Sequence, residues 1–524
     1  MGNCRWEEAL DGHLVPFLNI NGQEYCLGSR YDGHYMAQTW INFYVDQDIE
    51  NIIFYGIGDG QIILQLMEII RGKIIVIQPD DSLLHSVRQK GFWKKIQKCR
   101  KVILFSDNNW DEIEQVIRKT LNEDNLDCTK LAVHPGYSYI YGEELQKLSD
   151  ICNKISGEIS FMKQPIKRFI KAMIYNQIHN VFQMEKGVPV ARLKKRWDKD
   201  IPVVLVSAGP SLEKNVDDLK RLEHRGLIFC VDAALTVLLR HGIVPDMIAC
   251  TDATKKIDFY EDNNFKNIPL LVTTNAPEKL LINSGGVKLW GDDHTFIKML
   301  TQKVGIEQTV VPFYSGVATA LFATLLELGV KKIILIGQDL AYSEDGKSHV
   351  TGKEEGFVRN EDCRPEGYYG GKVWSRGDWM NFLRWFENAI SVYSDRQVIN
   401  ATEGGVRIKG TEQRSLKDVI NSLPNRCYDF NEIISNPMVA IQPAEYERLL
   451  AEYGKSFEDI KRIRELGYEK TFFEVDYEKV PIMRLVMDYM KSLDAATRKD
   501  RFEKALNYVE NSLSEVKHQF DLER

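Results

Sequence analysis

Residues 203–213 read VVLVSAGPSLE, and this stretch decides the fold. Four apolar residues lead into a small turn that contains a glycine and a proline, and a charged, helix-like segment follows. An apolar strand that ends in such a turn before a helix is typical of a parallel α/β sheet. Because glycine lets the backbone approach a ligand closely, the turn is also a candidate binding element.

The chain after this turn repeats the pattern of apolar strand and amphipathic helix. This alternation predicts a parallel sheet covered by helices. The predicted strands are 202–208, 227–233, 247–253, 269–275, 287–290 and 331–339, and the predicted helices between them include 216–225, 234–242 and 316–329.

The same alternation begins earlier in the chain, with strands predicted at 50–57, 73–80 and 101–107. The C-terminal part has apolar residues three and four apart, which predicts helices. The fold class is therefore α/β, with two Rossmann-like parallel-sheet domains and a helical C-terminal region. We predict an N-terminal domain 1–155, a helical connector 156–200, a central catalytic domain 201–425 and a helical domain 426–524.

The composition of the chain argues against two classes of function, nucleic-acid binding and membrane-spanning proteins. The chain has 524 residues, of which 44% are apolar and 27% charged, with a formal net charge of -7. A nucleic-acid partner is not expected, because phosphate binding needs a basic surface. Since no apolar run reaches about 18 residues, no membrane span is expected. The nine cysteines form no C-x-x-C pair, and no secretory signal is visible, so we expect reduced thiols in a cytoplasmic protein.

Polar and glycine residues follow the predicted strands of the central domain, at the edge where open α/β sheets bind ligands. A turn with glycine before a helix suits a phosphate, and two such turns indicate a nucleotide. The aspartates would contact ribose or base, or hold a metal ion. Alternatively, these glycines and serines only cap helices. The candidates are Ser207, Gly209, Pro210, Ser211, Asp232, Thr251, Asp252, Ser315, Gly316, Gly337 and Asp339.

Two further motifs carry hypotheses. The turn YGIGDG at 55–60, with Gln78 and Asp80 about twenty residues on, is close to a dinucleotide or methyl-donor fingerprint. A tight turn in a structural domain would have the same sequence. His349 lies in a polar loop after the last central strand and is a candidate general base, although such a histidine can also be merely solvated.

Several of these segments together resemble the motility-associated factor (Maf) family. The segments are VPVVLVSAGPSLEKN, FCVDAALTVLLRHGIVPDMIACTDA, FYSGVATALFATLLELGVKKIILIGQDLAYSEDGKSH and VINATEGGVRIKG, and GIGDG…VIQPD resembles the amino-terminal domain of that family. The resemblance implies a cytoplasmic glycosyltransferase. Its donor would be a CMP-activated nonulosonic acid (pseudaminic or legionaminic acid), and its acceptor would be Ser/Thr of flagellin, so that motility depends on it.

The central segment is also similar to bacterial sialyltransferases. This resemblance implies that the turns at Gly209–Ser211 and Ser315–Gly316 bind phosphate, and that Asp232, Asp252 and Asp339 serve the nucleotide or the fold. His349, Asp339 and Tyr342 would be the catalytic residues, with His349 as the base and Tyr342 as a donor to the phosphate. Ala208 stands where that family has a phosphate-contacting asparagine.

Two alternatives remain open at this point. The central segment is also similar to archaeal hydroxymethylpterin diphosphokinases, which implies an ATP- and Mg²⁺-dependent enzyme with Asp232 and Asp252 near the metal. A non-catalytic flagellin-binding protein is the third hypothesis.

Overall fold

The computed structural model describes residues 4–20, 22–45, 49–79, 81–105, 109–121, 125–255, 265–291, 295–308, 316–350, 363–476, 479–493 and 497–523. The chain divides into two compact units, Met1–Gln164 and Pro165–Arg524. In the described residues, no helix combines the length and the apolar character that crossing a bilayer requires.

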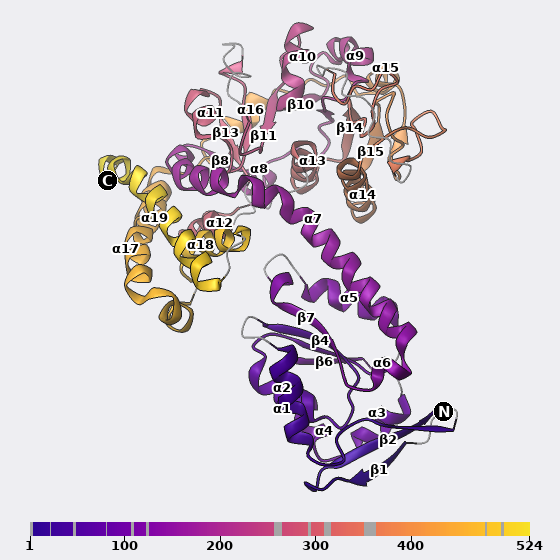
Figure 1. Ribbon diagram of the computed structural model, residues 1–524. Helices are drawn as coiled ribbons and strands as arrows, with labels where there is room; N and C mark the ends of the chain where they lie inside the picture. The colour runs from indigo at the N-terminus through magenta and orange to yellow at the C-terminus, as the bar shows by residue number, and fades with distance from the viewer. Residues whose placement is uncertain are drawn as a thin grey trace. The chain divides into compact units, whose positions relative to one another are not determined.

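The N-terminal unit contains a small antiparallel sheet and a parallel sheet (Figure 1). The antiparallel sheet has the order β1 (Cys4–Glu8), β2 (Leu14–Ile20), β3 (Gln23–Cys26). The parallel sheet has the order β6 (Val102–Phe105), β5 (Ile74–Ile77), β4 (Asn51–Tyr55), β7 (Thr129–Val133). Its helices are α1 (Gly33–Tyr44), α2 (Gln61–Ile69), α3 (Asp81–Arg88), α4 (Trp93–Lys98), α5 (Trp110–Thr120), α6 (Tyr137–Ile140) and the first part of α7 (Gly142–Asn180).

The described strands of the second unit form one parallel sheet of nine strands. In spatial order these are β16 (Glu412–Gln413), β15 (Gln397–Asn400), β14 (Lys332–Ile336), β9 (Val203–Val206), β10 (Leu227–Val231), β11 (Met247–Cys250), β12 (Leu270–Val272), β13 (Lys288–Trp290) and β8 (Val188–Pro189). Chain order reverses between β9 and β14, because β9 to β13 run to one side and β14 to β16 to the other.

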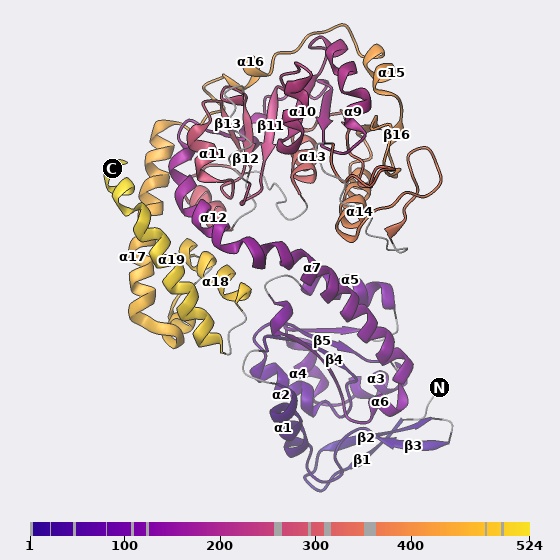
Figure 2. The same cartoon turned by 45° about the horizontal axis from the view of Figure 1, so that its top comes forward.

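Helices cover both faces of this sheet (Figure 2). The helices of this unit that follow α7 are α8 (Val190–Lys194), α9 (Leu212–Asn215), α10 (Leu235–Arg240), α11 (Glu278–Asn283), α12 (Thr295–Lys303), α13 (Val317–Leu328), α14 (Gly377–Val392), α15 (Leu416–Asn421), α16 (Phe430–Ile434), α17 (Pro443–Glu474), α18 (Pro481–Ser492) and α19 (Arg498–Glu523). Short 3-10 turns lie at Leu126–Cys128, Val181–Met184, Val216–Leu222 and Asp232–Ala234.

The pleat of β9 divides the core of the unit. Val204 and Val206 belong to a cluster with α9, α10, α11, α12 and the C-terminal helices, whereas Val203 and Leu205 belong to a cluster with α8, α13 and α14. Successive side chains of a strand point to opposite faces, so a fully apolar strand indicates burial on both sides. Helices α17, α18 and α19 lie side by side (Figure 1) and share the first of these clusters.

The predicted fold class is confirmed: the chain has two parallel-sheet units and a helical C-terminal region. Each predicted central strand is present, although most are shorter than predicted. The strands that the sequence did not predict are β1, β2, β3, β7, β8, β15 and β16. Strands β3, β8, β15 and β16 have only two to four residues, and β1 is largely exposed, so these strands offer no continuous buried apolar run. Strand β2 does contain an apolar run, LVPFL, which the sequence analysis did not assign. The segment predicted as a helix at 216–225 is a 3-10 turn over Val216–Leu222.

Candidate active site

A cavity of about 220 Å³ opens at the point where the order of the strands reverses. Open α/β sheets bind ligands at this position, because the loops after the two central strands diverge there. The cavity is lined by the turn after β9, the residues after β10 and β14, the start of α13 and one side of α14. The lining residues are Ser207, Ala208, Gly209, Val231, Asp232, Ala233, Gly316, Val317, Ala318, Thr319, Gly337, Gln338, Asp339, Leu340, Ser348, His349, Trp379, Phe382 and Phe386.

The structure thus brings together seven of the predicted site residues at one cavity: Ser207, Gly209, Asp232, Gly316, Gly337, Asp339 and His349. Pro210, Ser211, Thr251, Asp252 and Tyr342 are not among its lining residues. Ser315 lies outside the described residues, so the predicted Ser-Gly turn is described only from Gly316 onward.

The turn after β9 packs tightly against the loop after β14. A side chain at Gly209 would place its Cβ 2.0 Å from Oδ2 of Asp339 and 2.5 Å from the carbonyl oxygen of Gly337. The amide of Gly209 also donates to that carbonyl over 2.8 Å. Glycine is therefore required at position 209 by contact with the protein itself, whatever the cavity binds.

Asp339 joins the two loops. Its Oδ2 accepts a hydrogen bond of 2.7 Å from the hydroxyl of Ser211, and the backbone amide of Ser211 lies 3.3 Å from both carboxylate oxygens. The residue is 6% exposed. Burial raises the pKa of Asp339 to about 6, and the Ser211 hydrogen bonds oppose that shift. The sequence predicted Asp339 as a catalytic residue or as one that serves the nucleotide or the fold. In the structure its carboxylate accepts hydrogen bonds from the turn that was expected to hold phosphate.

Asp232 follows β10 and forms a buried ion pair. The residue is 3% exposed, its Oδ1 accepts from the amide of Ala233 over 2.7 Å, and its Oδ2 lies 3.1 Å from Nζ of Lys255. Burial raises the pKa of Asp232, and Lys255 opposes the shift. Lys255 was not predicted from the sequence, because it lies five residues beyond β11 in a segment with no recognisable motif.

The residues after β11 serve their own loop. Oδ1 of Asp252 accepts hydrogen bonds from the amide and the hydroxyl of Thr254, at 2.9 and 3.0 Å. Thr251 is buried, and Pro210 is half-buried beside the turn after β9. A carboxylate that closes a turn in this way is a common local motif, which the sequence pattern does not separate from a ligand contact.

His349 is exposed and lines the cavity. Its Nδ1 lies 3.0 Å from the hydroxyl of Ser348, a buried residue that also lines the cavity. This contact links the His349 ring to a second residue that lines the cavity. Tyr342, in contrast, is buried beside Trp379, with the two ring centroids 4.9 Å apart. Tyr342 therefore packs against a residue of the cavity wall and is not itself a lining residue.

One wall of the cavity is aromatic and comes from α14. Trp379, Phe382 and Phe386 contribute to it. The guanidinium of Arg376 stacks 4.0 Å from the centroid of the Trp379 ring, which fixes that ring in place. The cavity therefore has a polar side at the strand ends and an apolar side on a helix, an arrangement that suits an amphipathic ligand such as a sugar or a base.

The polar side does not fit a divalent cation. Oδ2 of Asp232 faces the ammonium of Lys255, and the Asp339 carboxylate accepts from Ser211. Within the ranges that the structure describes, no group of three or more His, Cys, Asp or Glu side chains is placed to hold a metal ion. Mg²⁺ prefers several oxygen ligands without a competing cation, so the Mg²⁺ candidate finds no donor set here.

The glycine-rich turn of the N-terminal unit is filled by the protein. The amide of Ile57 donates to Oε1 of Gln78 over 2.9 Å, and Tyr137 donates to the same oxygen over 2.9 Å. The amide of Gly58 donates to the Tyr137 hydroxyl over 3.2 Å. The positions where a pyrophosphate would bind in a dinucleotide site are thus occupied by Gln78 and Tyr137, which favours a structural turn.

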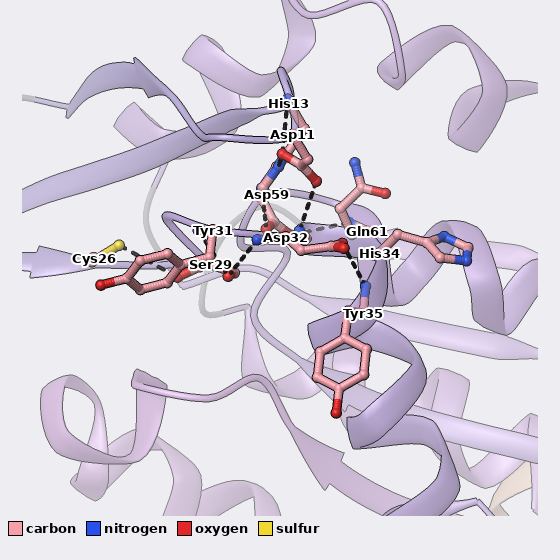
Figure 3. A network of polar contacts seen from close by, with 12 residues as sticks. Asp11, His13, Cys26, Ser29, Tyr31, Asp32, His34, Tyr35, Asp59 and Gln61 are labelled. Carbon is pink, nitrogen blue, oxygen red and sulfur yellow. Dashed lines mark hydrogen bonds and ion pairs between the residues drawn. The ribbon is translucent and has the colours of Figure 1, made fainter.

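Asp59 of the same turn belongs to a polar network with the antiparallel sheet (Figure 3). His13 lies between Asp11 and Asp59, with its Nδ1 on the Asp11 carboxylate and its Nε2 3.4 Å from Oδ2 of Asp59. Asp59 and then Asp11 raise the pKa of His13 to about 9. A protonated His13 thereby ties the loop before β2 to the turn after β4.

Comparisons with known proteins agree with this fold. A family model described as "6-hydroxymethylpterin diphosphokinase MptE-like" matches residues 175–345, about a third of the chain. A solved structure of a MAf glycosyltransferase from Magnetospirillum magneticum AMB-1 covers 99% of this chain and 91% of its own, with a TM-score of 0.56 and 15% sequence identity. No curated protein matches the sequence.

Two of the three resemblances that the sequence suggested are thus found, the diphosphokinase-like one in the sequence of the central segment and the Maf one in the fold of nearly the whole chain. The similarity to bacterial sialyltransferases stays a prediction. The chain is an α/β protein with the architecture of that MAf glycosyltransferase. At 15% sequence identity this similarity shows the fold alone, and an activity has to be inferred from the residues of the site.

Proposed function

We propose that this chain is a cytoplasmic glycosyltransferase that moves a nonulosonic acid from a CMP-activated donor to Ser/Thr hydroxyls of flagellin. The observation that carries the proposal is the cavity at the strand reversal, which has an exposed histidine, buried carboxylates and an aromatic wall. A CMP-sugar has hydroxyl groups for the carboxylates and a sugar ring and a base for the aromatic wall. The MAf glycosyltransferase with a similar fold supports the reaction class.

The reaction would be a displacement at the anomeric carbon. The hydroxyl oxygen of the acceptor forms a bond to this carbon while the bond from the carbon to the phosphate oxygen breaks, and the electron pair leaves on CMP. Nε2 of His349 takes the proton of the acceptor hydroxyl. Its Nδ1 stays with Ser348, 3.0 Å away, which keeps the ring in one orientation during the transfer.

The direct test measures transfer with purified components. The enzyme is incubated with flagellin and CMP-pseudaminic or CMP-legionaminic acid, and the mass of intact flagellin is followed. We expect the mass of flagellin to increase by whole nonulosonate residues. In His349→Asn the rate of this transfer should fall about 100-fold or more, because general-base catalysis contributes at least this much to the rate. Flagellin that gains no mass with either donor would contradict the proposal.

A pterin diphosphokinase is the second candidate, because the family model that matches residues 175–345 has that description. It would bind ATP with Mg²⁺. The ion pair of Asp232 with Lys255 speaks against a metal at that carboxylate. The melting temperature with added nucleotide distinguishes the candidates. CMP alone should raise the melting temperature of a transferase, and ATP should raise that of a kinase only when Mg²⁺ is present. Neither nucleotide should stabilise a non-catalytic flagellin-binding protein.

A further inference from the structure

The cavity poses an electrostatic problem for any nucleotide. Asp232 and Asp339 both line it, and both are buried. A phosphate group that entered beside two carboxylates would be repelled if both were ionised, and the interaction is strong where water is excluded. A cation within reach of the cavity would offset this repulsion if the ligand carries a phosphate.

Lys255 is such a cation. Its side chain is 20% exposed, and its Nζ lies 3.1 Å from Oδ2 of Asp232, a cavity-lining residue. Taking a carboxylate and an ammonium out of water together is costly, and apolar residues of the same volume would serve stability as well or better. The pair is therefore weak evidence for a role in stability alone, which directs attention to a ligand.

We propose that the ammonium of Lys255 binds the phosphate of the nucleotide, and that Asp232 then accepts a hydrogen bond from a hydroxyl group of the same ligand. Without ligand, the two side chains neutralise each other across 3.1 Å. When the nucleotide binds, Lys255 exchanges the carboxylate for a phosphate oxygen, and a ribose or sugar hydroxyl replaces the ammonium at Oδ2. The inference rests on the proposed function only in taking the ligand to be a nucleotide.

This assignment differs from the sequence-based one. The glycine turns at Gly209 and Gly316 were expected to hold phosphate through backbone amides. The amide of Gly209 donates to the Gly337 carbonyl, and that of Ser211 faces the Asp339 carboxylate, so these two donors are engaged within the protein. We therefore expect Lys255 to contribute more to phosphate binding at this edge of the sheet than the amides of Gly209 and Ser211 do.

The test compares each nucleotide with its nucleoside by isothermal titration calorimetry. The probes are CMP with cytidine and ATP with adenosine, so the difference within a pair reports the contribution of phosphate. The variants are Lys255→Met, which removes the charge, and Lys255→Arg, which keeps it. Asp232→Asn/Lys255→Met removes both charges and leaves no unpaired carboxylate if the single variant folds poorly. Lys288→Met is the matched control, since Lys288 is a partly buried lysine at the opposite, amino end of the same sheet.

We expect wild-type protein to bind CMP more tightly than cytidine. Lys255→Met should weaken CMP binding by about tenfold to hundredfold, the value of a charge-assisted hydrogen bond, and leave cytidine binding unchanged. Lys255→Arg should keep most of the preference for CMP, and Lys288→Met all of it. Equal effects of Lys255→Met on CMP and cytidine, or no effect on either, would overturn the proposal.

The ATP pair separates this inference from the proposed function. If wild-type protein binds ATP rather than CMP, and Lys255→Met removes its preference for ATP over adenosine, the role of Lys255 stands and the CMP donor is wrong. If the wild-type protein binds none of these nucleotides, both proposals are overturned.

Discussion

The hydroxyl of Ser211 donates to Oδ2 of Asp339 across 2.7 Å, although 127 residues separate the two in the sequence. This bond joins the turn after β9 to the loop after β14, on the two sides of the point where the strand order reverses. Residues of both loops line the cavity, so this hydrogen bond helps to hold the cavity walls in position.

Removal of this hydroxyl is the first prediction. Ser211→Ala should lower the free energy of unfolding by about 1.5–3 kcal/mol, because it leaves a buried carboxylate with fewer donors. Chemical denaturation measures the change. Ser514→Ala is the control, since its hydroxyl donates to a backbone carbonyl on an exposed helix face and its loss should cost little. A loss at Ser211 no larger than at Ser514 would contradict the prediction.

The raised pKa of Asp339 predicts how stability depends on pH. A carboxyl group whose pKa is about 6 in the folded state, above the 3.8 of the unfolded chain, favours the folded state most below pH 3.8, and this contribution is lost as the pH rises through 6. Asp339→Asn should therefore flatten the stability profile between pH 4 and 7. Urea denaturation of both proteins across this range measures it, and parallel profiles would contradict the assigned pKa.

The network around His13 predicts the pH dependence of the N-terminal unit. Its raised pKa means that protonated His13 stabilises the fold fully below pH 6.5, and that this stabilisation is lost as the pH rises through about 9. His13→Gln should lower the melting temperature clearly at pH 6.5 and little at pH 10. His518→Gln, at an exposed position, should change neither value. A loss at His13 that is equal at both pH values would rule out a charge-based tie.

The N-terminal glycine turn predicts a structural effect without a binding effect. Gly58 has a φ of 54°, and a Cβ there would lie 2.1 Å from the His134 ring. Gly58→Ala should destabilise the protein by about 1–3 kcal/mol. Gly91→Ala, which has no neighbour within 4 Å, should be nearly neutral. If NAD or S-adenosylmethionine stabilises wild-type protein but not Gly58→Ala, the turn is a cofactor site after all.

The aromatic wall predicts recognition of the sugar. Phe382 is half-buried on the cavity side of α14, whereas Trp385 on the same helix packs against Phe322 and Phe386 and is not a lining residue. Phe382→Leu should raise KM for the CMP-sugar several-fold and leave the affinity for CMP unchanged. Trp385→Leu should change neither. Equal losses of CMP-sugar and CMP binding would place the base, rather than the sugar, on this wall.

The sequence predicted the architecture well because buried parallel strands are continuous apolar runs. VVLV at 203–206 and LIFCV at 227–231 have no polar interruption, and each ends in the polar residues that mark the ligand-binding edge. Short strands such as QVIN at 397–400 lack this length. Their pairing with β14 comes from the tertiary structure and leaves no local signal.

The sequence predicted many of the residues that line the cavity, but it did not predict the contacts that these residues make with one another. Gly209 and Asp339 were expected to contact a ligand, but in the structure they also pack against each other. Tyr342 packs against Trp379 and does not line the cavity. Lys255 was missed because a lysine after a strand is ordinary in sequence, and its importance comes from Asp232, 23 positions earlier in the chain. Pairings across loops depend on the tertiary fold, so a single sequence does not reveal them.

The order of strands also determines when this protein can finish folding. Strand β9 lies beside β14 in the sheet, but the segment from Val206 to Lys332 has to be made between them. During synthesis one edge of β9 therefore remains without its partner until most of the chain has left the ribosome, and contacts so distant in sequence form slowly. An apolar strand with an open edge is a template for pairing between chains. Strand β9, which is interior in the finished sheet, is thus an open edge in the nascent chain and a place where aggregation can begin.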